Sequence, residues 1–316
     1  MKAEICKYLG GAKGAFTFTF DDGCYRGSSE EVIENYKRIY EDFGVKIKAT
    51  VGITVGFMHE WIIKFWQEAA DNGYFEIGSH SVGHDLSYLE STPLEVREKD
   101  AKGSKEQLME MFPGQKVETY ILPGGTYDEK GLEPLKEHYI AVRGNKDGIN
   151  YPGEIDWYDV KCFTAMLKRP LSDYTSFIDE VIKTGGWGMQ MNHWITHKEE
   201  DTFHSQNADT FHDECTYLGE KAKSGEVWVA SFEEAAKYIQ RYEKSDIKLT
   251  ENNGIYTAEI IGAGADKTDT PLTVCLYTDI PICLYNGESM GLVLQPRNGK
   301  ILIPIRKFQR FSLENY

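Results

Sequence analysis

The 316-residue chain has few cysteines, and this excludes two common ways of stabilising a domain. Its six cysteines form neither a Cys-x-x-Cys pair nor a Cys-His knuckle, so neither a disulfide framework nor a structural zinc knuckle is predicted. Reduced structural thiols are expected instead. A single disulfide remains possible because the number of cysteines is even. Cys275 and Cys283 could face each other across neighbouring strands.

Positive charge is also scarce, and long apolar runs are missing. Lys and Arg together number 35 against 50 Asp and Glu, and the formal net charge of −15 argues against nucleic acid or an anionic membrane as partner. No run reaches the roughly 18 residues of a membrane span. Residues 1–7 lack the apolar segment of a signal peptide. A cytoplasmic protein is therefore expected if Met1 is the native start, and a secreted or periplasmic one if a signal was removed.

Strand and helix patterns alternate along the first 244 residues. Apolar runs predict strands at 15–20, 47–53, 74–79, 117–122, 139–143, 158–164, 187–192 and 226–230. Apolar residues at helical spacing predict helices that include 28–43, 61–72, 93–112, 172–181 and 231–242, with Trp61 and Trp66 facing the core and with capping boxes at Thr92 and Ser231. Such repeated strand–helix units predict a parallel sheet, open or closed into a barrel.

The pattern changes near residue 245. Short β-type runs follow one another between Gly, Asn, Asp and Pro turns, without a helical period. The sequence therefore predicts an α/β domain over residues 1–244 and a small, sandwich-like antiparallel β domain over residues 245–316. The β domain could bind carbohydrate, mediate a homodimer or simply pack on the larger domain.

Two adjacent carboxylates follow the first strong strand. Phe and Thr alternate over residues 15–20, and the strand then continues into Asp21, Asp22 and Gly23. Adjacent carboxylates repel each other and are costly to desolvate, so a position at the end of a core strand needs a metal ion or a proton-transfer task. A solvated Asp-Gly turn is the alternative.

Histidines follow two other predicted strands. His80 and His84 come after 74–79, and His193 comes after 187–192. In a parallel barrel, functional groups lie at the carboxyl ends of the strands. Two histidines four residues apart and one aspartate form a two-His, one-carboxylate set, which suits a catalytic Zn²⁺ or another divalent metal.

The motifs Thr19-Phe20-Asp21-Asp22-Gly23 and Glu76-Ile77-Gly78-Ser79-His80-Ser81-Val82-Gly83-His84 resemble the signature of the polysaccharide deacetylases, carbohydrate esterase family four. The resemblance covers roughly residues 10–243. It implies a distorted (β/α) barrel of seven to eight parallel strands. It also implies that Asp22, His80 and His84 hold the metal, that Asp21 is the general base and that His193 is the general acid, for which His197 is an alternative.

The third family motif departs from the pattern, because the segment Ile121-Leu122-Pro123-Gly124-Gly125 has no arginine to pair with the base. Arg143, at the end of the next strand, could reach the same carboxylate. A backbone N–H near Gly124 or Gly125 would hold the oxyanion.

The remaining matches are weaker. Asp156-Trp157 resembles the fourth motif, in which the Asp tunes the acid histidine and the Trp forms a wall of the acetyl pocket. The other expected pocket residues are Gly124, Gly125, Tyr127 and Met191.

The resemblance implies a metal-dependent hydrolase that removes acetyl groups, above all N-acetyl groups, from an acetylated oligo- or polysaccharide. Its cofactor would be one divalent metal, Zn²⁺ first, with Co, Ni, Mn or Fe as alternatives. Two other functions remain open: hydrolysis of a small non-sugar amide or ureide on the same barrel, and sugar binding by an inactive homologue.

Overall fold

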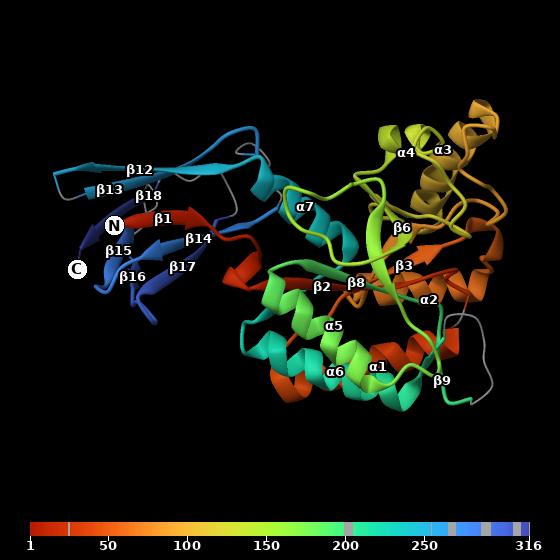
Figure 1. The fold of residues 1–316 in the computed structure, drawn as a ribbon, viewed down its shortest axis with the longest axis horizontal. Helices are drawn as coiled ribbons and strands as arrows, with labels where there is room; N and C mark the ends of the chain where they lie inside the picture. The colour runs from red at the N-terminus through yellow and green to blue at the C-terminus, as the bar shows by residue number, and fades with distance from the viewer. Residues whose placement is uncertain are drawn as a thin grey trace. The chain divides into compact units, whose positions relative to one another are not determined.

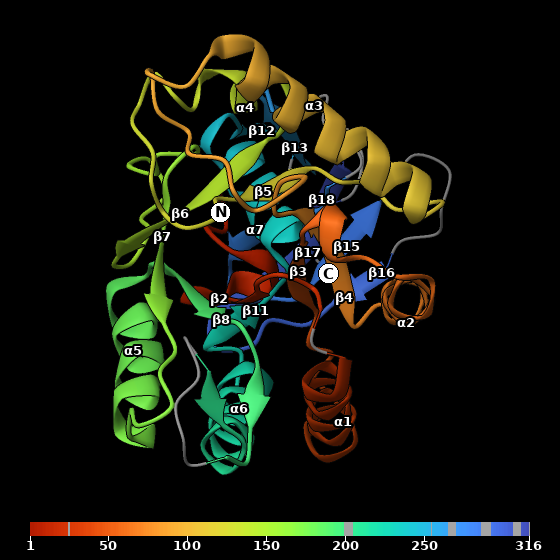
Figure 2. The same ribbon diagram turned by 90° about the vertical axis from the view of Figure 1, so that its right-hand side faces the viewer.

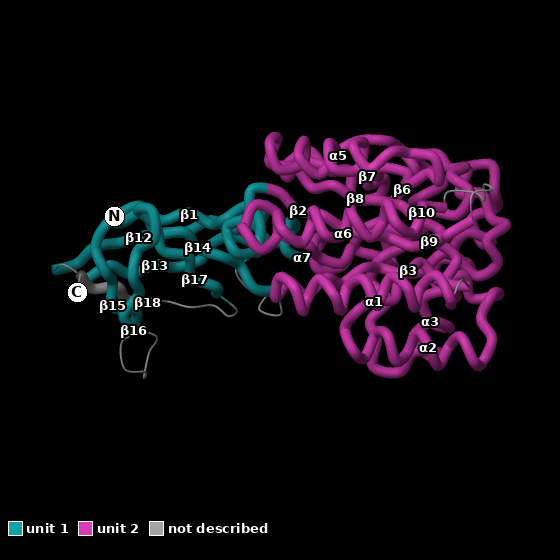
Figure 3. The backbone as a smooth tube through the Cα atoms, turned by 90° about the horizontal axis from the view of Figure 1, so that it is seen from below, with its two compact units in different colours: residues 1–13, 237–316 teal, residues 14–236 magenta. Residues whose placement is uncertain are grey.

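A computed structural model describes residues 1–24, 26–198, 205–253, 255–264, 270–285, 292–305 and 311–315. The chain forms two compact units, which are coloured separately in Figure 3: residues 14–236, and residues 1–13 together with 237–316. The division into domains at residue 244 stays a prediction. Among the described residues, no helix has the length and apolar character needed to cross a membrane.

The larger unit is a closed parallel barrel. Its strands β2, β3, β6 and β8 are labelled in Figure 1. β2 pairs with β3 and also with β8, which closes the ring, and an additional strand, β11, pairs with β2. The strands are β2 (Gly14–Phe20), β3 (Ala49–Ile53), β4 (Phe75–Ser79), β5 (Thr119–Ile121), β6 (Ala141–Asp147), β7 (Val160–Thr164), β8 (Trp187–Asn192) and β11 (Val227–Val229). The predicted α/β fold class, a distorted barrel of seven to eight strands, is confirmed.

The distortion has a local origin in the strand pairing. The first half of β2 pairs with β11, at residues 14–16, whereas its last two residues pair with β3. β4 and β5 share a single residue pair, Ser79 with Tyr120. The register between β6 and β7 shifts between Arg143 and Asp147. The barrel therefore stays closed while its strands separate at several places.

Helices surround the strands (Figure 2). They are α1 (Arg26–Phe43), α2 (Glu60–Asp71), α3 (Leu94–Met111), α4 (Glu133–His138), α5 (Leu171–Thr184) and α6 (Ala208–Lys223), and α7 (Phe232–Glu243) follows β11. The alternation in β2 separates two environments. Phe18 packs outward against Tyr36 of α1 and Phe211 of α6, while Thr19 accepts a hydrogen bond from Arg143 on the opposite side of the barrel. This is the period of two that the sequence predicts.

The smaller unit contains two antiparallel sheets, with strand orders β1-β14-β17 and β12-β13-β18-β15-β16. Its strands are β1 (Lys2–Ile5), β12 (Asp246–Asn252), β13 (Ile255–Ile261), β14 (Leu272–Tyr277), β15 (Ile282–Tyr285), β16 (Leu292–Leu294), β17 (Lys300–Ile305) and β18 (Phe311–Asn315). The predicted antiparallel β character is confirmed. A homodimer through this unit stays a prediction.

Cys275 and Cys283 do not face each other across neighbouring strands, so this prediction is wrong. Cys275 lies in β14, between Glu4 of β1 and Leu302 of β17, whereas Cys283 lies in β15 of the other sheet. Both are free thiols. Their separation along the sequence suggested adjacent strands, but β14 and β15 pair with different partners.

Two local predictions at helix starts are also wrong. The Trp61 side chain is 54% exposed, because it lies in the first turn of α2 on the side away from Ile62 and Trp66, which are buried. Thr92 does not cap α3, since its hydroxyl donates to the Ser87 carbonyl. By contrast, Ser231 and Glu234 form the predicted capping box of α7, each accepting a hydrogen bond from the backbone N–H of the other.

In the larger unit, a buried carboxylate accepts a hydrogen bond from the start of α7. Glu76 of β4 is 4% exposed and accepts hydrogen bonds from the Thr50 and Thr119 hydroxyls and from the Glu233 backbone N–H. Burial, reinforced by the Glu233 carboxylate, raises the pKa of Glu76 to about 8. The native state therefore holds a proton that the unfolded chain has already released at neutral pH.

We predict that the free energy of unfolding falls by about 1 kcal/mol as the pH rises from 7 to 8.5, because this raised pKa makes the folded state bind more protons in that range. Glu76→Gln should reduce this slope, as measured by urea unfolding at several pH values. Glu214, whose pKa burial raises to about 7, contributes separately and can be removed by Glu214→Gln. An unchanged slope in Glu76→Gln, with the exposed Glu98→Gln as control, would contradict the prediction.

Candidate active site

The turn after β2 is fixed from three sides. Asp22 and Gly23 have φ values of 74° and 72°, in the left-handed region. The Trp66 indole of α2 donates a 2.6 Å hydrogen bond to the Gly23 carbonyl. The Asp21 N–H donates to the Asn192 carbonyl at the end of β8, and the Thr54 N–H donates to the Asp22 carbonyl. The two carboxylates are therefore held by neighbouring strands and by α2.

The loop with His80 and His84 is equally constrained. Ser81 and His84 have φ values of 71° and 64°, and the Ser81 hydroxyl accepts a hydrogen bond from the His84 N–H. Asp100 of α3 supports this loop by accepting hydrogen bonds from the Val82 N–H and the Tyr88 hydroxyl. Sequence analysis missed Asp100, because it lies in a highly charged helix where nothing distinguishes it from exposed acids.

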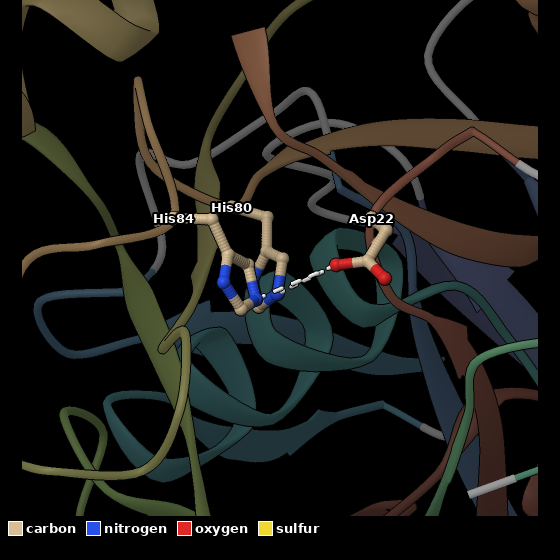
Figure 4. A group of neighbouring side chains, drawn as sticks. All are labelled: Asp22, His80 and His84. Carbon is tan, nitrogen blue, oxygen red and sulfur yellow. Dashed lines mark ion pairs between the residues drawn. The ribbon is translucent and has the colours of Figure 1, made fainter. Parts of the chain in front are cut away.

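Asp22, His80 and His84 come together (Figure 4). Asp22 Oδ1 lies 3.6 Å from His80 Nε2 and 3.4 Å from His84 Nε2, and one ligand atom from each residue lies within 4.8 Å of the others. His80 Nδ1 lies 2.8 Å from the Ile121 carbonyl, so this nitrogen carries the proton and Nε2 presents a lone pair to the cluster.

The cluster fits a divalent cation. His80 Nε2 is buried and has no hydrogen-bond partner among the residues described. Burial lowers the pKa of His80 to about 4, even though the Asp21 charge opposes the shift, so the imidazole is neutral at physiological pH. Two imidazole nitrogens and one carboxylate oxygen are donors that suit zinc and similar metals.

Asp21 forms a buried salt bridge with Arg143. The guanidinium makes two hydrogen bonds to the carboxylate, of 3.1 Å from Nη1 to Oδ1 and 2.8 Å from Nη2 to Oδ2. The two residues are 3% and 1% exposed. Burial by itself raises the pKa of Asp21, but the Arg143 charge, with smaller effects of His80 and His193, brings it below the usual value. The carboxylate is therefore ionised and fixed in orientation.

Arg143 lies beside the segment in which the third family motif lacks its arginine. Arg143 of β6 is the direct register partner of Ile121 in β5, two residues before Pro123. An arginine that is missing from one strand thus has a counterpart at the same level of the neighbouring strand. This is the contact that the sequence suggested as a hypothesis.

Met191 and His193 lie at the carboxyl end of β8. Met191 is 7% exposed within the strand, and the half-buried His193, just after its end, lies within electrostatic range of Asp21. His197, the alternative acid, has a 71% exposed side chain and its Nε2 lies 3.0 Å from Glu31 of α1. The structure therefore brings His193, rather than His197, toward Asp21.

The residues expected from the third and fourth motifs are divided between two places. Gly125, Tyr127 and Asp156 line one cavity beside β6. Trp157 instead packs against Trp187, the first residue of β8, with ring centroids 6.2 Å apart. Since His193 follows the last residue of β8, this placement does not support Trp157 as a wall of a pocket at His193. The fourth motif was matched on two residues only, which do not determine the direction of a side chain.

The backbone at Gly124 and Gly125 gives only part of the expected oxyanion site. The Gly125 N–H donates a 2.7 Å hydrogen bond to the Pro123 carbonyl and is therefore occupied. Gly124 has a φ of 61°, and a Cβ placed on it would meet no atom within 4 Å, so the backbone is open at this residue. Of the two glycines, Gly124 is the one that a substrate could approach closely.

The barrel, with its polar cluster at the carboxyl ends of β2, β4 and β8, has the arrangement typical of (β/α)-barrel enzymes. Residues 10–142 match the family model described as polysaccharide deacetylase. The match includes Asp21, Asp22, His80 and His84 and covers less than half of the chain. It ends before Arg143 and His193. No curated protein matches the chain.

Several solved structures are similar at low sequence identity. A family 4 carbohydrate esterase from Bacillus anthracis is 18% identical over 73% of this chain and 86% of that one, with a TM-score of 0.46. A family 4 pseudoenzyme from Bacillus anthracis is 12% identical over 71% and 65%, with a TM-score of 0.44. The peptidoglycan deacetylase PdaC from Bacillus subtilis is 12% identical over 72% and 92%, with a TM-score of 0.40. These scores are low, and the fold assignment rests on the strand pairing.

We predict that the chelated protein takes up one Zn²⁺ per chain, as measured by calorimetric titration, because three donors already converge on one point. His84→Ala should lower the affinity about 100-fold or more, since one of three ligands is lost. The exposed His212→Ala is the matched control and should bind zinc as the unaltered protein does. Equal zinc affinity in the His84 and His212 variants would contradict the assignment.

Proposed function

We propose that the protein is a metal-dependent deacetylase that hydrolyses N-acetyl groups of an acetylated oligo- or polysaccharide. The observation that carries the proposal is the pair of adjacent, differently partnered carboxylates: Asp22 faces His80 and His84, while Asp21 is held by Arg143. One carboxylate is thereby suited to bind a cation and the other to accept a proton. The family match over residues 10–142 supports the same reaction.

An amide is a poor electrophile, so its hydrolysis needs a polarised carbonyl, an activated water and a protonated leaving amine. A divalent ion held by Asp22, His80 and His84 would supply Lewis acidity and lower the pKa of a water. Asp21 would accept the proton of the attacking water at its carboxylate. Arg143 would keep this carboxylate ionised and oriented, because both its oxygens receive hydrogen bonds from one planar group.

His193 would protonate the departing amine. It follows β8 and lies near Asp21, and an imidazole can hold and release a proton close to neutral pH. In this assignment the base follows β2 and the acid follows β8, and these strands pair directly over residues 15–20 and 187–192. The two groups can therefore act on one substrate from adjacent strands of the barrel.

Acetate release from N-acetylglucosamine oligomers, acetylated xylan and peptidoglycan fragments tests the proposal. We predict release by the zinc-loaded protein, loss on chelation, and a fall in kcat of about 100- to 10,000-fold in Asp21→Asn and His193→Ala. Zinc binding without acetate release from any of these substrates would favour hydrolysis of a small amide or ureide. If the protein neither binds zinc nor releases acetate, the result would favour a sugar-binding homologue.

Arg143→Ala provides a separate test of the salt bridge. We predict that kcat falls about 100-fold while KM changes little, because the base loses its orientation but the substrate surface is retained. Arg143→Lys, which keeps the charge but not the paired hydrogen bonds, should recover only part of the activity. Arg169→Ala, which removes a guanidinium packed on Phe163, is the control. Full turnover in a folded, zinc-binding Arg143→Ala protein would contradict the proposed role.

A further inference from the structure

Three buried polar side chains form a cluster between β8 and α6, outside the candidate active site. Gln190 of β8, Gln206 of β10 (Gln206–Asn207) and Glu214 of α6 are each 0% exposed. Gln206 Nε2 donates a 2.6 Å hydrogen bond to Glu214 Oε2, and Gln190 Nε2 lies 3.2 Å from the same oxygen and 3.1 Å from Gln206 Oε1. Because burying a carboxylate costs free energy, an apolar side chain would suit this position better if packing were its only task.

The cluster holds the chain on both sides of His193. On the amino-terminal side, Gln190 lies in β8, three residues before His193. On the carboxyl-terminal side, β9 (Ile195–Thr196) pairs in parallel with β10, and the Gln206 N–H donates a 3.0 Å hydrogen bond to the Trp194 carbonyl. Gln206 therefore joins the residue after His193 to the same carboxylate that Gln190 contacts.

Glu214 connects these two sides to a long helix. It lies within α6, whose first turn is capped by the side chain of Asn207, the residue after Gln206. β9 and β10 both contact α6, and all three elements are labelled in Figure 3. A further hydrogen bond, of 2.5 Å from the Ile195 N–H to the Ser28 hydroxyl of α1, also holds this segment. The short turn that carries His193 is thus fixed on both sides by hydrogen bonds, and Glu214 takes part on each side.

We propose that Glu214, acting through Gln190 and Gln206, is a positioning residue for His193. The inference rests on the proposed function, in which His193 is the general acid. When the C–N bond of the amide breaks, its electron pair goes to the nitrogen, which accepts a proton from the His193 imidazolium. This transfer requires hydrogen-bond distance between the two groups, so a displaced turn slows it. The metal donors follow β2 and β4 instead, so loss of Glu214 should affect the acid and spare the metal site.

NMR spectra of the chelated protein test the position of His193 without turnover. The proton–carbon signal of the His193 ring is identified by its absence in His193→Ala. Glu214→Ala should shift or broaden this signal, because both glutamine amides lose their common acceptor. Glu214→Gln keeps an acceptor oxygen and should preserve the signal. Glu220→Ala, which changes an exposed glutamate of the same helix, is the matched control and should also preserve it.

The dependence of turnover on the leaving group is a second readout, which a merely structural role would not produce. In zinc-loaded Glu214→Ala, kcat for the amide of N-acetylglucosamine oligomers should fall about tenfold with little change in KM. Hydrolysis of para-nitrophenyl acetate, whose phenolate departs without a proton, should fall less than about twofold. In the His193→Ala background, Glu214→Ala should add no further loss on the amide, because the two residues act as one unit.

The zinc affinity of Glu214→Ala should equal that of the unaltered protein and shows that the variant is folded. If Glu214→Ala does not fold, Gln206→Ala takes its place, because it removes the link to the Trp194 side and retains the contact between Gln190 and Glu214. An unchanged His193 signal, or equal losses on the amide and the aryl ester, would overturn the positioning role.

The two readouts also separate this inference from the proposed function. Acetate release by the unaltered protein, together with an unchanged His193 signal in Glu214→Ala, would keep the deacetylase and remove the positioning role. A displaced signal in Glu214→Ala, without acetate release by the unaltered protein, would keep the positioning of His193 and remove the deacetylase.

Discussion

The buried salt bridge between Asp21 and Arg143 is the interaction on which the arrangement of the candidate site depends. Two adjacent carboxylates at the end of a core strand would repel each other and lose hydration. Arg143 compensates the charge of Asp21 with a guanidinium that is itself buried, and both carboxylate oxygens are engaged. Asp22 can then face the two histidines, so each acid has a separate environment and a separate chemical use.

The irregular strand pairing of the barrel is compatible with this site. Asp21, His80 and His193 directly follow β2, β4 and β8, whereas Arg143 lies inside β6, before its carboxyl-terminal half. The register shift in β6 begins at Arg143, and the residues after it form the side of the neighbouring cavity. One strand therefore carries the arginine that holds the base and, further along, Asn145 and Lys146, which line the cavity.

The sequence predicted much of the fold because its signals are local. The Phe–Thr alternation of β2, the apolar faces of α1 and α2 and the capping box at Ser231 are each visible within one segment, and the structure confirms them. Predictions at the borders of elements were less successful. Trp61 fits the helical pattern but lies in the exposed first turn, and Thr92 bonds to a preceding loop that no local pattern reveals.

By itself the sequence determined which residues could do chemistry: Asp21, Asp22, His80, His84 and His193 all come directly after predicted strands, and parallel strands bring their carboxyl ends to one side. Only the tertiary structure decided how these residues are partnered. The pairing of β5 with β6 places Arg143 at the level of Ile121 and lets it reach Asp21, and the pairing of Trp157 with Trp187 moves that ring away from His193. Such contacts depend on strand register and side-chain direction, which link residues far apart in the sequence.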